Sequence, residues 1–256
     1  MSGGIGFETR IWFWGVDADW HFPRNLYGFI LKENLMPLHT PWKKSKKYGD
    51  VYGGRKRVKF ADNIFRRAHS IARPNSTDIL PILIEDNPSR DFFFPLSGEE
   101  TLEALKSLPK RDYEGITHIW LRRPKKQDYV DGKLPFAWFT CGSGVRAIII
   151  FAWPNDLQIS YGSKRPSNQI VNELTRFGAN LERKGKEWVS VWSKESVRKF
   201  YIHILYHEVG HHIDKYYRHW SAANTKALEE YAEQYAFAKT ATATHTYNRL
   251  KKKNKA

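Results

Sequence analysis

Five consecutive residues, His207-Glu208-Val209-Gly210-His211, place two imidazoles and a carboxylate within one helical turn. On an α-helix, positions i and i+4 lie one above the other, so His207 and His211 can each offer a ring nitrogen to one metal ion. Glu208 would then lie beside that ion, as a base for a water molecule whose pKa zinc lowers to about 7. The spacing therefore predicts a hydrolytic Zn²⁺ site, with His207 and His211 as metal ligands and Glu208 as the catalytic residue.

The residues before the motif indicate that it lies in a helix and not in a loop. Ser193 can cap a helix that begins at Lys194. Apolar residues then recur at helical spacing, namely Val197, Phe200, Tyr201, Ile204, Leu205 and Val209. We therefore expect an amphipathic helix. The alternative, a helix with a few surface histidines in a chain that has ten, remains open.

Two further residues of the same helix fit a metal site. A glycine inside a helix destabilises the helix by about 1 kcal/mol relative to alanine. Gly210 therefore indicates that another segment approaches this turn closely. Asp214 follows His211 at i+3 and is expected to accept a hydrogen bond from the second nitrogen of a ligand imidazole. The alternative partner for Asp214 is Arg218, four residues later.

A catalytic zinc ion has three protein ligands and an open position, so a third ligand must come from another segment. Asn224 or Thr225 can cap a second helix that runs through residues 227–238. Four residues of this helix share one face, namely Glu229, Ala232, Glu233 and Ala236. Small side chains allow close helix packing, so a glutamate on this face can reach the metal. The alternative is a solvated acidic face.

The motif and the second helix together resemble the gluzincin zinc metallopeptidases, including phage, toxin and mobile-element members, over residues 206–239. In that group HExxH is followed by a Glu in an E-x-x-A setting, which either Glu229 or Glu233 satisfies. The first register implies that Glu229 is the third metal ligand and that Glu233 supports a ligand, and the second reverses these roles. The second also resembles an E-A-N-x-F-A pattern, from which Gln234 and Tyr235 depart. The resemblance implies Zn²⁺ as cofactor and a metalloendopeptidase that cleaves protein or peptide substrates.

The segments before the motif predict an α+β fold. Residues 99–108 are expected to form a short helix ended by Pro109, and residues 116–121, 147–153 and 187–192 to form strands. This order of helix, mixed sheet, active-site helix and glutamate helix is similar to the small catalytic half of zincins. There, an edge strand beside the metal pairs with extended substrate. Residues 147–153 are the candidate edge strand, and a buried core strand is the alternative.

Composition limits the class of protein. With 256 residues, 41% of them hydrophobic, the chain is long enough to bury a core. No apolar run approaches the 18 residues of a membrane span, and the N-terminus does not read as a signal peptide. The one cysteine, Cys141, excludes an intrachain disulfide, which suits the cytoplasm. We expect a cytoplasmic protein with no membrane partner, and composition does not indicate its oligomeric state.

Basic residues are spread unevenly along the chain. The chain has 42 Lys and Arg against 27 Asp and Glu, for a formal net charge of +15. Two clusters lie among aromatic residues and glycines: Lys43, Lys44, Lys46 and Lys47, then Arg55, Lys56 and Arg57. Phosphates can take the charges and unstacked bases can lie on the rings, so these residues are candidate contacts for nucleic acid. The alternative is a solubilising surface.

We expect three parts in the chain. Residues 1–75 form a basic, aromatic-rich N-terminal segment, residues 76–245 a zincin-like metallopeptidase domain, and residues 246–256 a basic, disordered tail. The favoured function is a zinc-dependent metallopeptidase. The alternative is a nucleic-acid-binding protein whose metal site is structural or vestigial.

Overall fold

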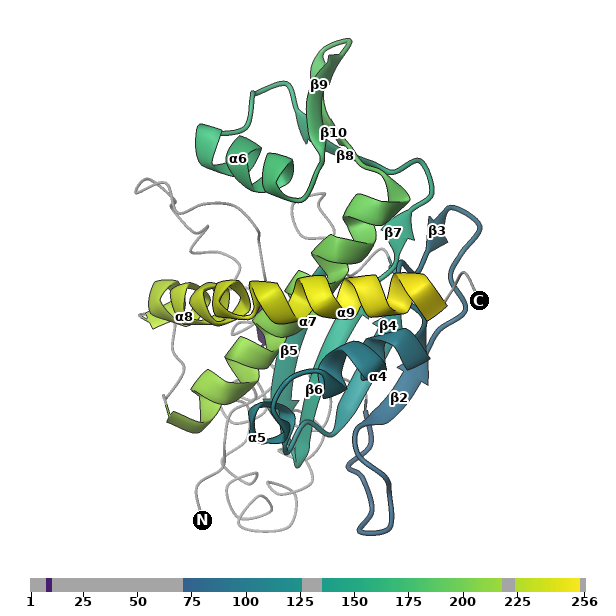
Figure 1. Cartoon of the computed structure of the whole chain (residues 1–256), viewed down its shortest axis with the longest axis vertical. Helices are drawn as coiled ribbons and strands as arrows, with labels where there is room; N and C mark the ends of the chain where they lie inside the picture. The colour runs from purple at the N-terminus through teal and green to yellow at the C-terminus, as the bar shows by residue number, and fades with distance from the viewer. Residues whose placement is uncertain (1–7, 11–70, 126–134, 218–223, 254–256) are drawn as a thin grey trace, which may run out of the picture. The chain divides into compact units, whose positions relative to one another are not determined.

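The structure, a computed structural model, describes residues 8–10, 71–125, 135–217 and 224–253. The chain divides into two compact units, Met1–Gly6 with Val16–Ala72, and Phe7–Gly15 with Arg73–Ala256. Only residues 71 and 72 of the first unit are described, so the fold that follows is that of the second unit. It contains both helices and small sheets (Figure 1), which confirms the α+β class.

A five-stranded mixed sheet forms the centre of this unit. Its order is β1 (Glu8–Arg10), β5 (Ala137–Gly142), β6 (Val145–Phe151), β4 (His118–Arg122) and β2 (Ile82–Glu85). The strands β2, β4 and β6 are parallel, whereas β5 is antiparallel to β6 and β1 is antiparallel to β5. Two of the expected strands are therefore present, as β4 and β6.

The candidate edge strand is wrong, because β6 is the central strand of the five. Its residues Ala147 to Phe151 are all buried. Ile148 and Ile150 pack in the main core, and Ile149 packs on the other face of the sheet with Trp138 and Phe151. A continuous apolar run is typical of a strand that is covered on both faces. The alternative interpretation, a buried core strand, is the correct one.

A smaller sheet and a helix lie between β6 and the motif in the sequence. Three antiparallel strands form the sheet in the order β8 (Gln158–Gly162), β10 (Glu187–Val191) and β9 (Asn180–Lys184). The expected strand at 187–192 is β10, but it does not join the main sheet. The helix α6 (Asn168–Arg176) is capped by the side chain of Ser167. Two short strands, β3 (Phe92–Phe93) and β7 (Trp153–Pro154), form a separate pair.

The helix expected at 99–108 is α4 (Gly98–Lys106). Its N-terminus has a capping box, in which Ser97 accepts a hydrogen bond from the Glu100 backbone and Glu100 accepts one from the Ser97 backbone. Pro109 separates α4 from the short helix α5 (Lys110–Tyr113). Ala104 and Leu105 of α4 are buried in the same core as the motif helix. These helices fix one side of the segment that carries the histidines.

The motif lies in α7 (Lys194–Tyr217), the long helix that crosses the main sheet in Figure 1. The backbone N–H of Ser196 donates to the side chain of Ser193 over 3.0 Å, which confirms the expected cap. Every residue from Phe200 to His212 is buried, so this stretch is covered all round and is not a surface amphipathic helix. Neither α7 nor any other helix in the described ranges is long and apolar enough to cross a membrane.

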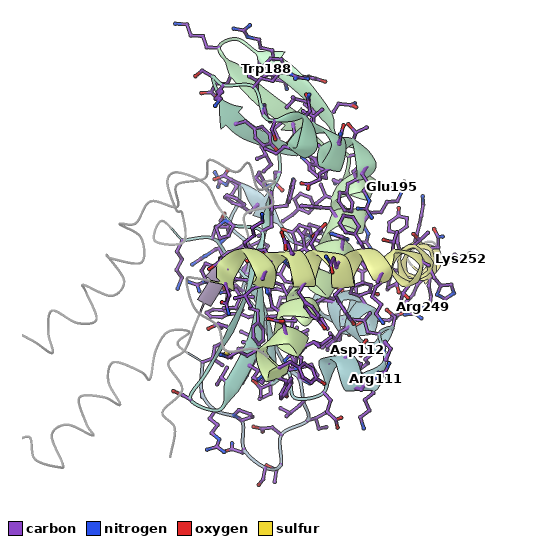
Figure 2. All side chains as sticks on the ribbon, turned by 90° about the vertical axis from the view of Figure 1, so that its left-hand side faces the viewer. Arg111, Asp112, Trp188, Glu195, Arg249 and Lys252 are labelled. Carbon is purple, nitrogen blue, oxygen red and sulfur yellow. The ribbon has the colours of Figure 1, made fainter. Side chains whose placement is uncertain are left out.

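Two helices follow α7 and pack against it. The first is α8 (Thr225–Ala238), with Asn224 in the expected N-cap position but without a capping hydrogen bond from its side chain. The second, α9 (Thr240–Lys253), includes residues 246–253, which the sequence was expected to leave as a disordered tail. Tyr247 and Leu250 are buried, and basic residues that suggested disorder pair with earlier acids. The Nε of Arg249 is 2.8 Å from Glu103, and the Nζ of Lys251 is 3.1 Å from Glu195. Figure 2 labels Arg249 and Lys252 beside α9, which is seen there nearly end-on.

The close approach expected at Gly210 is confirmed, and the approaching segment is α8. A Cβ atom on Gly210 would lie 2.7 Å from the Cα of Ala232 and 3.1 Å from its carbonyl oxygen. Both of these are backbone atoms, which cannot move aside as a flexible side chain could. At this crossing α7 and α8 are therefore as close as two helices can pack, and only glycine fits at position 210.

This contact predicts the effect of Gly210→Ala. Helix propensity alone would stabilise the protein by about 1 kcal/mol. The added methyl group must instead displace α8, and overpacking of this kind destabilises a protein by about 1–3 kcal/mol. We expect the urea midpoint of unfolding to fall. An unchanged or raised midpoint would show that α8 does not press on Gly210.

Candidate metal centre

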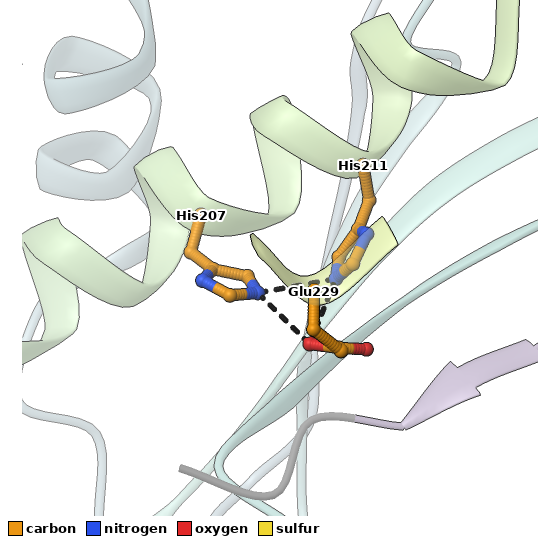
Figure 3. Close-up of side chains that lie close together, drawn as sticks. All are labelled: His207, His211 and Glu229. Carbon is orange, nitrogen blue, oxygen red and sulfur yellow. Dashed lines mark hydrogen bonds and ion pairs between the residues drawn. The ribbon is translucent and has the colours of Figure 1, made fainter. Parts of the chain in front are cut away.

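The structure brings three side chains of the motif helix and the following helix together, namely His207, His211 and Glu229 (Figure 3). The Nε2 atoms of the two histidines are 3.1 Å apart. The Oε2 atom of Glu229 lies 3.4 Å from Nε2 of His207 and 3.5 Å from Nε2 of His211. These three atoms form a nearly equilateral triangle that could hold a metal ion.

The size of the triangle fits a metal ion. In a tetrahedral zinc site with bonds of about 2.0–2.1 Å, neighbouring ligand atoms lie about 3.3–3.4 Å apart. The three separations observed between the donor atoms, 3.1, 3.4 and 3.5 Å, surround that value. Two imidazole nitrogens and one carboxylate oxygen are also a donor set that zinc prefers.

Of the two glutamates that the sequence left open, Glu229 is the one whose oxygen meets both Nε2 atoms. Glu233 lies one turn further along α8 and reaches the other side of the His207 ring. Its Oε2 atom is 3.0 Å from Nδ1 of His207. When Nε2 binds a metal, the ring proton is on Nδ1, so this carboxylate accepts it and fixes the tautomer. The geometry thus matches the first register, in which Glu229 is the third metal ligand and Glu233 supports a ligand histidine, here His207.

A third histidine of α7 extends this arrangement. His203 is one turn before His207, is 3% exposed, and has its Nε2 atom 3.5 Å from Oε1 of Glu233. One carboxylate therefore lies between two imidazoles. Sequence reasoning missed His203. The signal was present, because His203, His207 and His211 follow one another at i, i+4 and i+8.

The charges of the group are strongly coupled. Burial opposes a charge on His207, but hydrogen bonds to Glu229 and Glu233 raise its pKa to about 10. Burial lowers the pKa of His211, although the charge of Glu229 acts in the opposite direction. For Glu229, burial alone would raise the pKa, but the charge of His211 and hydrogen bonds from both histidines lower it to about 2. Without a metal ion, His207 is therefore the positively charged member of the group at neutral pH, while His211 is neutral and Glu229 is ionised.

Glu208 is fully buried beside this group. Burial raises its pKa well above the usual range of a carboxyl, and the charge of His207 and the backbone of Phe139 act against this shift. Neither carboxylate oxygen makes a hydrogen bond of normal geometry within the described part of the chain, although the backbone of Phe139 approaches the group. Buried carboxylates are rarely left in this way, because an unmet polar group destabilises the fold. An unsatisfied carboxylate next to a triangle of metal donors is what a site for an ion and its water would contain.

Two other residues near the motif have separate positions. Asp214 is buried and its charge favours protonation of His211, but the structure gives no hydrogen bond between Asp214 and Nδ1 of His211, so the expected hydrogen bond is not observed. His212 points elsewhere. It accepts a hydrogen bond at Nδ1 from Arg146 over 3.0 Å and donates from Nε2 to the carbonyl of Glu114 over 2.9 Å. Burial and the charge of Arg146 lower the pKa of His212 to about 4, so a neutral ring anchors α7 to β6 and α5.

Several residues singled out in the sequence lie outside the described residues. Arg218, the alternative partner of Asp214, is one of them. The candidate nucleic-acid contacts are the others: Lys43, Lys44, Lys46, Lys47, Arg55, Lys56 and Arg57. Binding of nucleic acid through these clusters stays a prediction from the sequence.

Comparison of the chain with protein-family models, with curated proteins and with solved structures found no match. The function is therefore inferred from the geometry and chemistry of the site.

Substitution of Glu229 by glutamine tests whether Glu229 is a metal donor. Glu229→Gln should lower metal affinity by more than the 10- to 100-fold typical of residues that support a ligand, because it removes a donor. Glu230→Gln is the matched control, since Glu230 is the next residue, is exposed and pairs with Lys226. Competition with a chromophoric chelator measures the affinities. Equal affinities for the two variants would exclude Glu229 as a ligand.

The pKa of His207 predicts how metal affinity depends on pH. A metal can bind Nε2 only after the protonated ring loses a proton, while His211 and Glu229 have none to lose at neutral pH. Between pH 6 and pH 8, affinity should rise about tenfold per pH unit, with about one proton released per ion bound. Calorimetry in buffers of different ionisation enthalpy counts the protons. An affinity independent of pH would contradict this charge state.

Proposed function

We propose that this chain is a zinc-dependent metalloendopeptidase of the gluzincin type, with a zincin-like catalytic domain. The observation that carries the proposal is the buried carboxylate of Glu208, without a hydrogen-bond partner in the described chain, beside the triangle of His207, His211 and Glu229. The motif, the helix that bears it and the glutamate on the next helix are the elements on which the resemblance to gluzincins rests.

The number of donors favours a catalytic site over a structural one. A structural zinc ion has four protein ligands, whereas a catalytic zinc ion has three and keeps one position for water. Among the described residues, no fourth His, Cys, Asp or Glu joins the group. The side chain of Glu229 is 27% exposed, whereas those of His207 and His211 are 4% and 0% exposed, so of the three donor side chains that of Glu229 reaches the surface. These features support hydrolysis.

In the proposed reaction three residues bind the metal ion and one transfers the proton. A zinc ion held by His207, His211 and Glu229 would lower the pKa of water to about 7 and polarise the carbonyl of a peptide bond. Glu208 accepts the proton that water loses as its oxygen attacks the carbonyl carbon. The same carboxyl group then donates this proton to the amine nitrogen as the C–N bond breaks. Burial raises the pKa of Glu208, so its ionised form is a stronger proton acceptor, and the positive charge of a bound zinc ion would favour that ionised form.

Glu208→Gln separates metal binding from catalysis. The amide keeps the shape of the side chain but cannot accept the proton, so we expect zinc content to remain at one ion per chain. Cleavage of an unbiased peptide library should fall by about 10²- to 10⁴-fold, the usual contribution of a general base. His207→Ala should lose both zinc and cleavage. Cleavage that persists in Glu208→Gln at the wild-type rate would refute the proposed role of Glu208.

A further inference from the structure

His203 is the histidine of α7 that no part of the proposed chemistry uses. It is 3% exposed and lies one turn before His207 on the same face of the helix. Yet it does not belong to the group of donors, which comprises His207, His211 and Glu229. A buried imidazole in this position needs another explanation.

The contacts of His203 lead to the metal ligand through one side chain. Its Nε2 atom is 3.5 Å from Oε1 of Glu233, and the other oxygen of Glu233 is 3.0 Å from Nδ1 of His207. Glu233 is partly exposed, with 24% of its side chain accessible. A glutamate has several rotatable bonds, so a single contact at one oxygen restricts it only in part. Nε2 of His203 approaches the other oxygen at ion-pair distance, without hydrogen-bond geometry, and restricts the carboxylate further.

Aromatic rings in turn hold His203. The ring of Phe177, which follows α6, is 4.9 Å from the imidazole, and the ring of Phe237 in α8 is 5.5 Å from it. The guanidinium of Arg176 lies 3.7 Å from the centre of the Phe237 ring. The imidazole is therefore fixed between two helices other than its own.

We propose that His203 is a positioning residue of the metal centre. It holds Glu233, and Glu233 holds His207 in the tautomer that leaves Nε2 for the ion. Carboxylates that support ligand histidines contribute 10- to 100-fold to metal affinity or activity. Because His203 acts through such a carboxylate, its removal should weaken binding by about tenfold, the lower end of that range. The inference rests on the proposed metal centre and assigns it a further residue.

Two polar substitutions of similar size test the role of the Nε2 proton. The amide nitrogen of glutamine reaches about as far as Nε2 of histidine, whereas that of asparagine ends near Nδ1. In the full-length protein we expect His203→Gln to bind Zn²⁺ within about threefold of the wild type, and His203→Asn to bind about tenfold more weakly. The visible spectrum of bound Co²⁺ should change in His203→Asn and not in His203→Gln. Equal affinities and equal spectra for the two variants would refute the role of His203.

A double-mutant cycle tests whether His203 acts through Glu233. In the Glu233→Gln background, His203→Asn should have no further effect on affinity, because the carboxylate that it orients is gone. Independent, additive losses would show that His203 has only a general effect on the fold. Tyr206→Phe is the matched control, since it removes the hydroxyl that hydrogen-bonds Ser107 on another side of α7. Its affinity for Zn²⁺ should equal that of the wild type.

These measurements use the metal alone, so they do not depend on cleavage of a peptide. If the wild-type protein binds no Zn²⁺ or Co²⁺, both the proposed function and the role of His203 are wrong. If it binds metal and the two His203 variants behave alike, only the role of His203 is wrong. If it binds metal with the expected coupling but cleaves no peptide, the positioning role stands and the peptidase function does not.

Discussion

The contact between Gly210 and Ala232 sets the geometry on which the metal centre depends. The two helices touch there at backbone distance, because a Cβ atom on Gly210 would come within 2.7 Å of the Cα of Ala232. Glu229 lies one turn before Ala232, and Glu233 is the residue after it. The crossing therefore places one carboxylate at Nε2 and the other at Nδ1 of His207. Moving α8 away by the width of a methyl group would separate both carboxylates from the ring at once.

Burial is the second constraint, and it decides what each polar residue of α7 must do. A helix covered on all sides can carry histidines and a tyrosine only if their polar atoms find partners. Three histidines face α8 and its glutamates, His212 faces Arg146, and Tyr206 faces Ser107 and α4. Glu208 departs furthest from this rule in the described chain, since both its oxygens are buried without a hydrogen bond of normal geometry, whereas in His203 and in His211 this holds for one ring nitrogen each. A stable fold tolerates such a group where function requires it.

Local sequence signals predicted the elements, and long-range packing decided how they combine. Capping, helical spacing and Gly210 were sufficient to predict α7, α8 and their close approach. They favoured Glu229 and left Glu233 as an alternative, because both lie on one face of α8 and the choice depends on where α8 sits along α7. That position is held by contacts remote in sequence, such as the hydrogen bond from Tyr235 to Asp112 in α5. In the same way, the isoleucines of β6 indicated burial but not the order of strands. The lysines at the end of α9 suggested disorder, although one face of this helix is buried.

The charge of the site explains why two carboxylates accompany two ligand histidines. Contacts with His207 and its neighbours lower the pKa of both Glu229 and Glu233 to about 2, so both are ionised, while the ring of His207 carries one positive charge. The metal-free group is thus left with one net negative charge in a largely buried place. A divalent ion that replaces the proton of His207 brings the group to neutrality, which a low-dielectric interior favours. A site with Glu229 alone would become positive on binding the same ion. Glu233 therefore orients His207 and also supplies the charge that matches the donor set to a dication.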